Sequence, residues 1–389
     1  MTNTTSLSLD VEYQWVDDAQ QLDALCNQWQ ALGAIAMDTE FVRTDTFYPK
    51  PGLLQIGTGR EIYLVDPINL VDHAGFKALL ANNNVTKVLH ACSEDLEVLR
   101  CCFGVLPTPV FDTQLAASFC GYGFSIGYGN LMKAMFQLEL PKDATRSDWL
   151  QRPLGDVQKN YAALDVAHLL VVYGTLLKQL KDKNMLDRVL ADCQDLVNQA
   201  NDTTQVDPDY YLKVKHAWRL KKPALQILKQ LCLWREQEAR RRDIPRNRIF
   251  KDVVLFEIAQ TKPPHLAKLS TIEGVQGRAI RDFGQQVLQT VRDALSQDES
   301  TWPPLLPKPL PKESGGLSKT LKATVARVAE QQQLPTEVLV RKADLQTLLY
   351  SVYDSRAPEL SPRLAQGWRY EAIGKVLLEQ ARQKLEELT

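Results

Sequence analysis

Two carboxylates end a short apolar stretch near the start of the chain, in 34-AIAMDTEFVR-43. Residues 34–37 are small or apolar, which indicates a buried strand that runs directly into Asp38 and Glu40. An ionised carboxylate is costly to bury unless a positive charge meets it, and Arg43 is the basic residue close by in sequence. A bound metal ion would also neutralise the pair if further carboxylates lay within reach.

Two more carboxylates belong to helical segments farther along the chain. Asp95 lies in the first turn of a predicted helix, directly after a predicted strand at 87–90. Asp165 lies in the amphipathic stretch 156–180, which predicts one long helix, and Tyr161 precedes it by four residues on the same helix face. Strand ends and helix starts of α/β domains converge on one edge, so we expect these carboxylates to meet the first pair.

A cleft with four carboxylates could support metal-assisted chemistry. The four groups would repel one another at neutral pH, and oxygen ligands favour hard cations such as Mg²⁺ or Mn²⁺. Two such ions about 3.5–4 Å apart suit in-line displacement at a phosphodiester, because one activates a water and the other stabilises the leaving oxygen. Tyr161 could orient that water, but an unperturbed pKa near about 10 makes it a poor base.

The predicted elements divide the chain into an α/β part and a helical part. Strand and helix signals alternate up to roughly residue 200, and the strand signals then fade. The stretch 303-PPLLPKPLPKESGG-316 predicts a semi-rigid linker. A helix, a proline and a second helix occur on each side of it, in RRRDIPRNRIF and EQQQLPTEVLV, which indicates two copies of one module.

Composition and charge are those of a globular protein with an uneven charge distribution. The 389 residues are 44% hydrophobic and 24% charged, which fits two to four domains on a scale of about 100–200 residues each. Residues 1–100 hold 14 acidic and 6 basic residues, a net charge of −8, and residues 211–260 hold 13 basic and 5 acidic ones, a net charge of +8. This asymmetry fits a metal site with a polyanion-binding region, or two solvated surfaces of opposite sign.

The cysteines and the N-terminal residues indicate the cellular compartment in which the protein is expected. The seven cysteines include no CxxC pair, which is typical of a reducing compartment. The start MTNTTSLSLDVEY has no apolar core of a signal peptide, and no window holds 18 uninterrupted apolar residues. We therefore expect a cytoplasmic protein without a membrane partner.

The segments that carry these carboxylates resemble a known family. DTEF, HACSEDLEVL and YAALDVAHL occur in the order of the three exonuclease motifs of the DEDD superfamily, and Tyr161, in place of a His, is typical of the tyrosine-containing branch. FVRTDTFYPK and RSDWLQRPL narrow the resemblance to ribonuclease D. The stretch LKQLCLWREQEARRRDIPRNRIFKDVVLFEIA resembles an HRDC domain, the helical module that ribonuclease D shares with RecQ helicases.

The resemblance implies an α/β, ribonuclease-H-like exonuclease domain followed by two all-α, HRDC-like domains. The boundaries we expect are 1–205 for the exonuclease domain, 206–297 for the first HRDC domain, 298–316 for the linker and 317–389 for a divergent second HRDC-like domain. It further implies 3′–5′ trimming of RNA, tRNA precursors above all, with two divalent cations and no obligate protein partner. Asp38, Glu40, Asp95 and Asp165 would be the metal ligands, and Tyr161 would orient the water.

Basic residues after the exonuclease segment are candidates for contacts with RNA. The run 240-RRRDIPRNR-248 would contact phosphates through Arg240, Arg241, Arg242, Arg246 and Arg248. A solvated turn explains the same run equally well.

Three other residues near the motifs are expected to support the fold rather than the chemistry. His90 ends a strand and is expected to be packed or hydrogen-bonded. Asp112 could cap a helix, and Trp149 is expected in the core.

Two other functions remain open from the residues alone. A DNA 3′–5′ exonuclease would use the same four carboxylates. A catalytically silent nucleic-acid-binding scaffold is the other, although the four carboxylates and Tyr161 are all present.

Overall fold

The computed structural model describes residues 7–70, 73–141, 147–202, 205–354 and 357–388, and the first part of the N-terminal stretch discussed above lies outside them. The chain forms two compact units. The first lies within Met1–Val42, Pro49–Asn201 and Leu310–Thr389, and the second within Arg43–Tyr48 and Asp202–Pro309.

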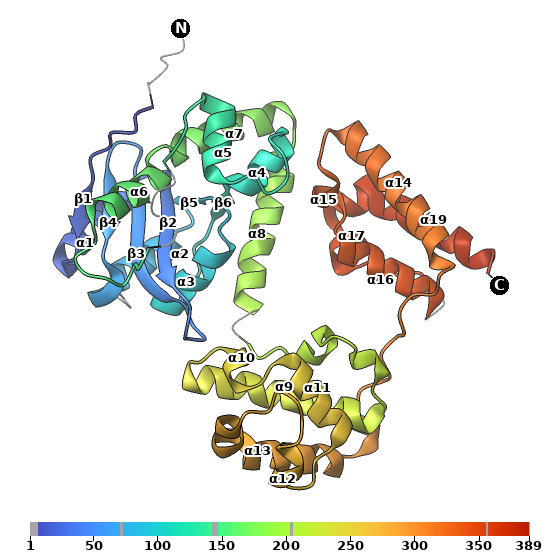
Figure 1. Cartoon of the computed structure of the whole chain (residues 1–389). Helices are drawn as coiled ribbons and strands as arrows, with labels where there is room; N and C mark the ends of the chain where they lie inside the picture. The colour runs from blue at the N-terminus through green and yellow to red at the C-terminus, as the bar shows by residue number, and fades with distance from the viewer. Residues whose placement is uncertain (1–6, 71–72, 142–146, 203–204, 355–356, 389) are drawn as a thin grey trace. The chain divides into compact units, whose positions relative to one another are not determined.

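A mixed six-stranded sheet forms the centre of the first unit (Figure 1). The strand order is β1-β4-β3-β2-β5-β6, in which β2 pairs antiparallel with β3 and parallel with β5. The predicted strand with the first two carboxylates is therefore central, with a neighbour on each side. The strands are β1 Gln14–Val16, β2 Ala34–Val42, β3 Lys50–Gly57, β4 Ile62–Val65, β5 Thr86–Leu89 and β6 Val110–Asp112.

Helices cover both faces of this sheet. Successive residues of each strand point to opposite faces, and apolar residues of β2 belong to a core on each of them. Ile35 and Met37 of β2 belong to a core with the helices α1 to α3, whereas Ala36 belongs to a core with α4 and α7. The helices are α1 Ala19–Trp29, α2 Ala74–Ala81, α3 Ser93–Phe103, α4 Thr113–Cys120, α5 Tyr128–Phe136, α6 Asp156–Ala167, α7 Leu169–Asp182 and α8 Leu186–Asp202.

The stretch expected to form one long helix is two helices, α6 and α7, which meet at His168. The His168 ring is buried and its Nε2 lies 2.8 Å from the carbonyl oxygen of Ser8. By length and composition alone, Asp156–Asp182 would be apolar enough to cross a membrane, a test that the core helices of globular domains also pass. Here α6 and α7 pack on the sheet, with Leu169 and Val172 in the core.

Close contact between α6 and the sheet depends on a glycine in β3. A Cβ atom at Gly57 would lie 2.8 Å from the carbonyl oxygen of Val166 in α6, closer than such atoms pack. Glycine in a strand often marks the close approach of another backbone segment. The missing side chain thus lets α6 lie directly on β2 and β3.

The C-terminal part of the first unit is a helical domain that packs on α8. Asp192 of α8 and Arg369 are both buried and form a bidentate ion pair, with Oδ1 and Nη1 2.6 Å apart. Trp368 lies beside this pair and stacks edge-on against Phe119 of α4. The helices are α14 Ser314–Gln332, α15 Thr336–Leu339, α16 Lys342–Tyr353, α17 Pro362–Ala365, α18 Gly367–Arg369, a π-helical turn Tyr370–Gly374 and α19 Lys375–Glu386.

The second unit is also helical. It contains α9 Lys222–Arg242, α10 Arg246–Ile249, α11 Asp252–Thr261, α12 Leu266–Leu269 and α13 Gly277–Ser296, with 3₁₀ turns at Tyr210–Lys213, Ala217–Arg219 and Glu299–Thr301.

The two helical domains repeat one local geometry, as the sequence predicted. The long helices α9 and α14 both end at a residue in the left-handed region, Asp243 with φ 50° and Gln333 with φ 52°. A proline then precedes a four-residue helix in each case, Pro245 before α10 and Pro335 before α15. The α14 helix begins at Ser314, inside the range expected to be linker.

Substitution of Gly57 tests the close approach of α6. The added methyl group of Gly57→Ala should lower the free energy of unfolding by about 1–3 kcal/mol, because the helix backbone has to move away. Urea unfolding of the full chain would measure the loss. Gly33→Ala is the control, since a Cβ atom there meets nothing within 4 Å. Equal effects at both glycines would contradict the packing described for α6.

Candidate active site

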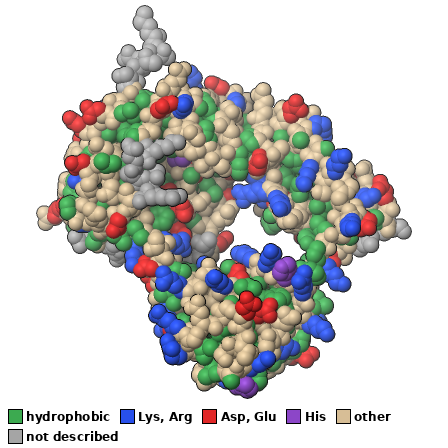
Figure 2. Space-filling view, viewed as in Figure 1, with side chains coloured by type: hydrophobic (Ala, Val, Ile, Leu, Met, Phe, Trp, Pro, Cys, Tyr) green, Lys and Arg blue, Asp and Glu red, His purple; other side chains and the backbone are tan. Residues whose placement is uncertain are grey.

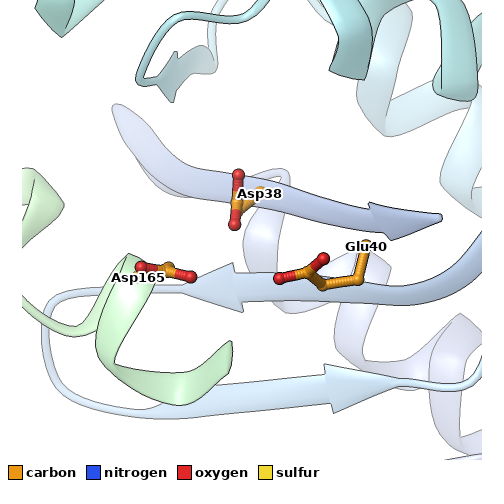
Figure 3. A group of neighbouring side chains, drawn as sticks. All are labelled: Asp38, Glu40 and Asp165. Atoms are coloured by element: carbon orange, nitrogen blue, oxygen red, sulfur yellow. The ribbon is translucent and has the colours of Figure 1, made fainter. Parts of the chain in front are cut away.

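Three of the predicted carboxylates lie together on one face of the sheet. Asp38 and Glu40 are two residues apart in β2 and so share a face, and α6 brings Asp165 to the same place (Figure 3). One carboxylate oxygen from each residue lies within 4.8 Å of the other two. Their side chains are partly buried. This spacing is suited to oxygen coordination of a metal ion.

The fourth predicted carboxylate, Asp95, lies nearby but is held separately. It is buried in the first turn of α3, and its Oδ1 accepts a hydrogen bond of 2.5 Å from the Thr39 hydroxyl. Thr39 lies between the two carboxylates of β2 and points to the opposite face. The charge of Asp95 raises the pKa values of Asp38 and Glu40, so the four groups interact.

The pKa values of all four carboxyls are raised, chiefly because burial disfavours the charged form. The pKa of Glu40 rises to about 8, that of Asp165 to about 7 and that of Asp95 to about 6. The pKa of Asp38 rises well above its usual value, from burial and from the charges of the other three. Without a counter-charge, the site therefore holds protons that a cation would displace.

The Tyr161 hydroxyl faces the carboxylates as the sequence predicted. It donates a hydrogen bond to Asp165 one helical turn later in α6. Burial and the charges of Asp165, Glu40 and Asp38 raise its pKa above the usual value. The raised pKa favours the neutral phenol, which suits the role of orienting a neighbouring group.

Asp112 caps a helix, as expected. Asp112 caps α4 through Leu115 N, and its other oxygen accepts a hydrogen bond of 2.8 Å from Cys92 N, just before the helix that carries Asp95. The backbone N–H of Asp112 points in turn to Cys193 Sγ of α8, at 3.3 Å.

His90 and Trp149 are packed residues, as expected. His90 Nδ1 lies 2.9 Å from Thr113 Oγ1, and Nε2 lies 3.0 Å from the carbonyl oxygen of Ile126. Trp149 is buried against Tyr161, with ring centroids 6.3 Å apart.

Two residues beside the cluster were not identified from the sequence. Gln55 of β3 is fully buried and lies directly opposite Asp38 in the sheet. Tyr128 begins α5, and the charges of Asp165 and Asp38 act on its hydroxyl. The pairing register between β2 and β3 would have identified Gln55, but the sequence alone does not give that register.

Four of the five predicted RNA-contacting arginines form ion pairs inside the second unit. Two pair with the buried carboxylate of Glu236 and two with that of Glu238. The pairs are Arg240 and Arg246 with Glu236, and Arg241 and Arg242 with Glu238.

The ion-paired arginines also pack against aromatic rings. Arg240 and Arg246 lie over the ring of Phe47, with their guanidinium carbons 5.0 and 4.7 Å from its centroid. Asp243 holds this segment by accepting hydrogen bonds from the backbone of Phe47 and Tyr48. Arg240 and Arg246 therefore have a structural role in this unit.

Arg242 and Arg248 line an open groove of about 1150 Å³ in the second unit. Its lining has both signs of charge, with Lys251 and Lys268 beside Glu257. Figure 2 shows basic side chains over the surface of this unit, interspersed with acidic and hydrophobic ones. Arg248 is exposed at this groove.

The raised carboxyl pKa values predict how stability depends on pH. Without cations, the folded chain holds more protons than the unfolded chain from about pH 4, the usual carboxyl pKa, to about pH 8. Stability should therefore fall as pH rises through this window. Melting temperatures in EDTA should be higher near about pH 5.5 than near about pH 8, and Mg²⁺ should reduce the difference. A melting temperature that rises with pH in EDTA, or an unchanged slope in Asp38→Asn, would contradict this.

Three family models match successive parts of the chain. Residues 13–181 match the family model described as 3′–5′ exonuclease. Residues 224–291 match the HRDC domain, and residues 316–377 match the ribonuclease D, C-terminal HRDC domain. The third match begins at residue 316, which was expected to be the last residue of the linker.

Two similar proteins of known name and one solved structure were compared with this chain along its length. Ribonuclease D of Pseudomonas paraeruginosa is 43% identical over 94% of this chain and 97% of its own length, and ribonuclease D of Escherichia coli is 34% identical over 94% and 98%. The crystal structure of Escherichia coli RNase D, described as an exoribonuclease involved in structured RNA processing, superposes with a TM-score of 0.88 at 32% identity and covers 96% of this chain and 99% of its own. This chain therefore belongs to the ribonuclease D family of 3′–5′ exoribonucleases, in the DEDD superfamily.

Proposed function

We propose that this chain shortens RNA from its 3′ end by hydrolysis with two divalent cations, Mg²⁺ or Mn²⁺, held by Asp38, Glu40, Asp95 and Asp165. The observation that supports this most directly is the group of three carboxylate oxygens within 4.8 Å of one another, from Asp38, Glu40 and Asp165. Asp95 adds a fourth charge from α3.

The donor set fits hard divalent cations. All four side chains offer oxygen, which Mg²⁺ and Mn²⁺ prefer. Burial and mutual repulsion raise the pKa values of these carboxyls, and a cation beside them would favour the ionised forms. When bound, the cations would lower the pKa of a water at the scissile phosphate and stabilise the leaving oxygen.

The protein's own groups would position the reactants. Tyr161 is hydrogen-bonded to Asp165, so its oxygen would be placed to accept a hydrogen bond from the attacking water. Thr39 fixes the direction of Asp95 through the bond of 2.5 Å. Because both partners are held by packed elements, the fourth carboxylate is oriented before substrate arrives.

Structured RNA with a 3′ end is the proposed substrate, and tRNA precursors are the class that we expect. The Escherichia coli relative is described as an exoribonuclease involved in structured RNA processing, and it matches this chain across all its domains. We further propose that the chain works in the cytoplasm, without a membrane or an obligate protein partner. Exposed arginines of the first HRDC domain, Arg248 among them, would contact the RNA body.

Metal dependence and direction of cleavage test the proposed reaction. A 5′-labelled RNA with a 3′ extension should give a descending ladder in Mg²⁺ and no cleavage in EDTA, because the carboxylates need counter-charges to ionise together. Asp165→Asn should lower kcat by orders of magnitude and leave RNA binding intact. Early internal fragments, or full activity in EDTA, would contradict the proposal, and preferential digestion of a matched DNA strand would instead support a DNA exonuclease.

Substitutions at two neighbouring arginines distinguish a role in RNA binding from a role in ion pairing within the second unit. Arg248→Glu should raise Kd for a tRNA-like substrate and reduce the slope of log K against log salt by about 0.7–0.9, the value for one lost phosphate contact. Arg246→Glu should mainly lower the stability of the second unit, because it faces the buried carboxylate of Glu236. Binding measured against salt, with melting curves, distinguishes the two effects. Arg327→Glu, an exposed reversal in the other helical domain, is the control. An unchanged salt slope in Arg248→Glu would remove that residue from the RNA-binding surface.

A further inference from the structure

Two buried polar side chains beside the carboxylates lack the hydrogen bonds that burial requires. Both amide atoms of Gln55 and the hydroxyl of Tyr128 are shielded from solvent without a partner at hydrogen-bonding distance and angle among the residues that the structure describes. Such groups are rare, because an unsatisfied buried donor costs about 1–3 kcal/mol. Their location next to Asp38 and Asp165 therefore calls for a physical explanation.

The sheet register places Gln55 at the cluster. Asp38 and Gln55 are direct cross-strand partners in the antiparallel pair β2–β3, so their side chains share one face and their Cβ atoms lie about 4.5–5.5 Å apart. The α6 helix, which carries Asp165, covers the same face. The Gln55 amide thus lies beneath this helix and beside the carboxyl group of Asp38.

Tyr128 approaches the same carboxylates from α5. Its ring packs against His90, with centroids 5.5 Å apart, and His90 is itself anchored to Ile126. Asp165 and Asp38 are the charged groups that act on its hydroxyl and raise its pKa, after burial, which supports a location on the side of the carboxylates. The backbone N–H of His168 also acts on the phenol oxygen, but an N–H can only donate. The phenol proton therefore has no acceptor among the described residues.

We propose that Gln55 and Tyr128 are positioning residues for the metal site, which donate hydrogen bonds to the carboxylates of Asp38 and Asp165 when these hold cations. This inference rests on the proposed function. Ligating carboxylates in metal sites are commonly hydrogen-bonded by a surrounding layer of donors that fixes their orientation. A carboxylate that holds a cation is a strong acceptor, and both groups have a donor without a partner. The two groups thus favour the metal-bound form of the cluster.

This role predicts opposite effects with and without metal. Removing either donor should leave the melting temperature of the metal-free protein unchanged or raise it, because an unsatisfied buried group is lost. The same change should weaken cation binding by about 10- to 100-fold, the usual effect of losing a group that orients a ligand. A residue that serves only packing would lower the melting temperature equally in both states.

The experiment compares Tyr128→Phe, which keeps the ring, and Gln55→Met, which keeps the length of the side chain, with the unaltered full chain. Binding of Mn²⁺ and Mg²⁺ without nucleic acid is measured by the rise in melting temperature with cation concentration, and for Mn²⁺ by electron paramagnetic resonance. The Mg²⁺ dependence of RNA cleavage is a second readout, in which a high Mg²⁺ concentration should restore most of kcat.

Matched controls remove a similar group elsewhere. Tyr122→Phe deletes a hydroxyl that accepts a hydrogen bond from Gln179, and Gln226→Met deletes a buried amide in the second unit. Both should keep the cation affinity of the unaltered chain. Unchanged affinity in Tyr128→Phe and Gln55→Met, or an equal loss of melting temperature with and without cation, would overturn the inference. An unaltered chain that binds neither cation would overturn the proposed function as well.

Discussion

Mutual repulsion among the carboxylates on one face of the central sheet is the constraint on which the rest of the nuclease domain depends. Asp38 and Glu40 share that face because strand residues alternate, and Asp165 arrives on a helix packed directly above them. Such a group would separate if its elements were free to move. Each carboxylate is instead fixed to a packed element, so the repulsion is reduced by bound protons or cations and not by movement of the elements.

The packing around the cluster explains how that position is maintained. The close approach of α6 at Gly57 holds Asp165 against the sheet. Asp112 fixes the backbone before α3 through Cys92 N, and Thr39 then directs Asp95. These contacts join residues far apart in the sequence. The site is therefore a property of the assembled sheet and helices, and none of its segments would form it alone.

Spacing together with the motif resemblance predicted the carboxylates and Tyr161 as neighbours. The strand was expected to end at the first two carboxylates, but β2 continues through Asp38 and Glu40 to Val42. The sequence did not predict that Asp95 would be bound by Thr39, or that Gln55 and Tyr128 would lie beside the cluster, since those facts depend on register and packing. The long helix was predicted without its break at His168, because the apolar pattern continues across that residue.

The sequence contained a signal that these arginines form ion pairs within their own helix. Glu236 precedes Arg240 by four residues and Glu238 precedes Arg242 by four, the spacing of ion pairs on one helix face. The pairing with Arg246, ten residues after Glu236, depends instead on the turn after α9.

The buried pair of Asp192 and Arg369 has a consequence for chains that lose their C-terminus. A chain that ends before Arg369 would leave Asp192, a buried residue of α8, without the partner of its ion pair. The next residue on that helix, Cys193, accepts the backbone hydrogen bond of Asp112, whose carboxylate holds the start of α3. Proteolytic cleavage near the C-terminus would therefore affect the helix that carries Asp95. The specific activity measured on a partly degraded preparation would then be lower than that of the intact enzyme.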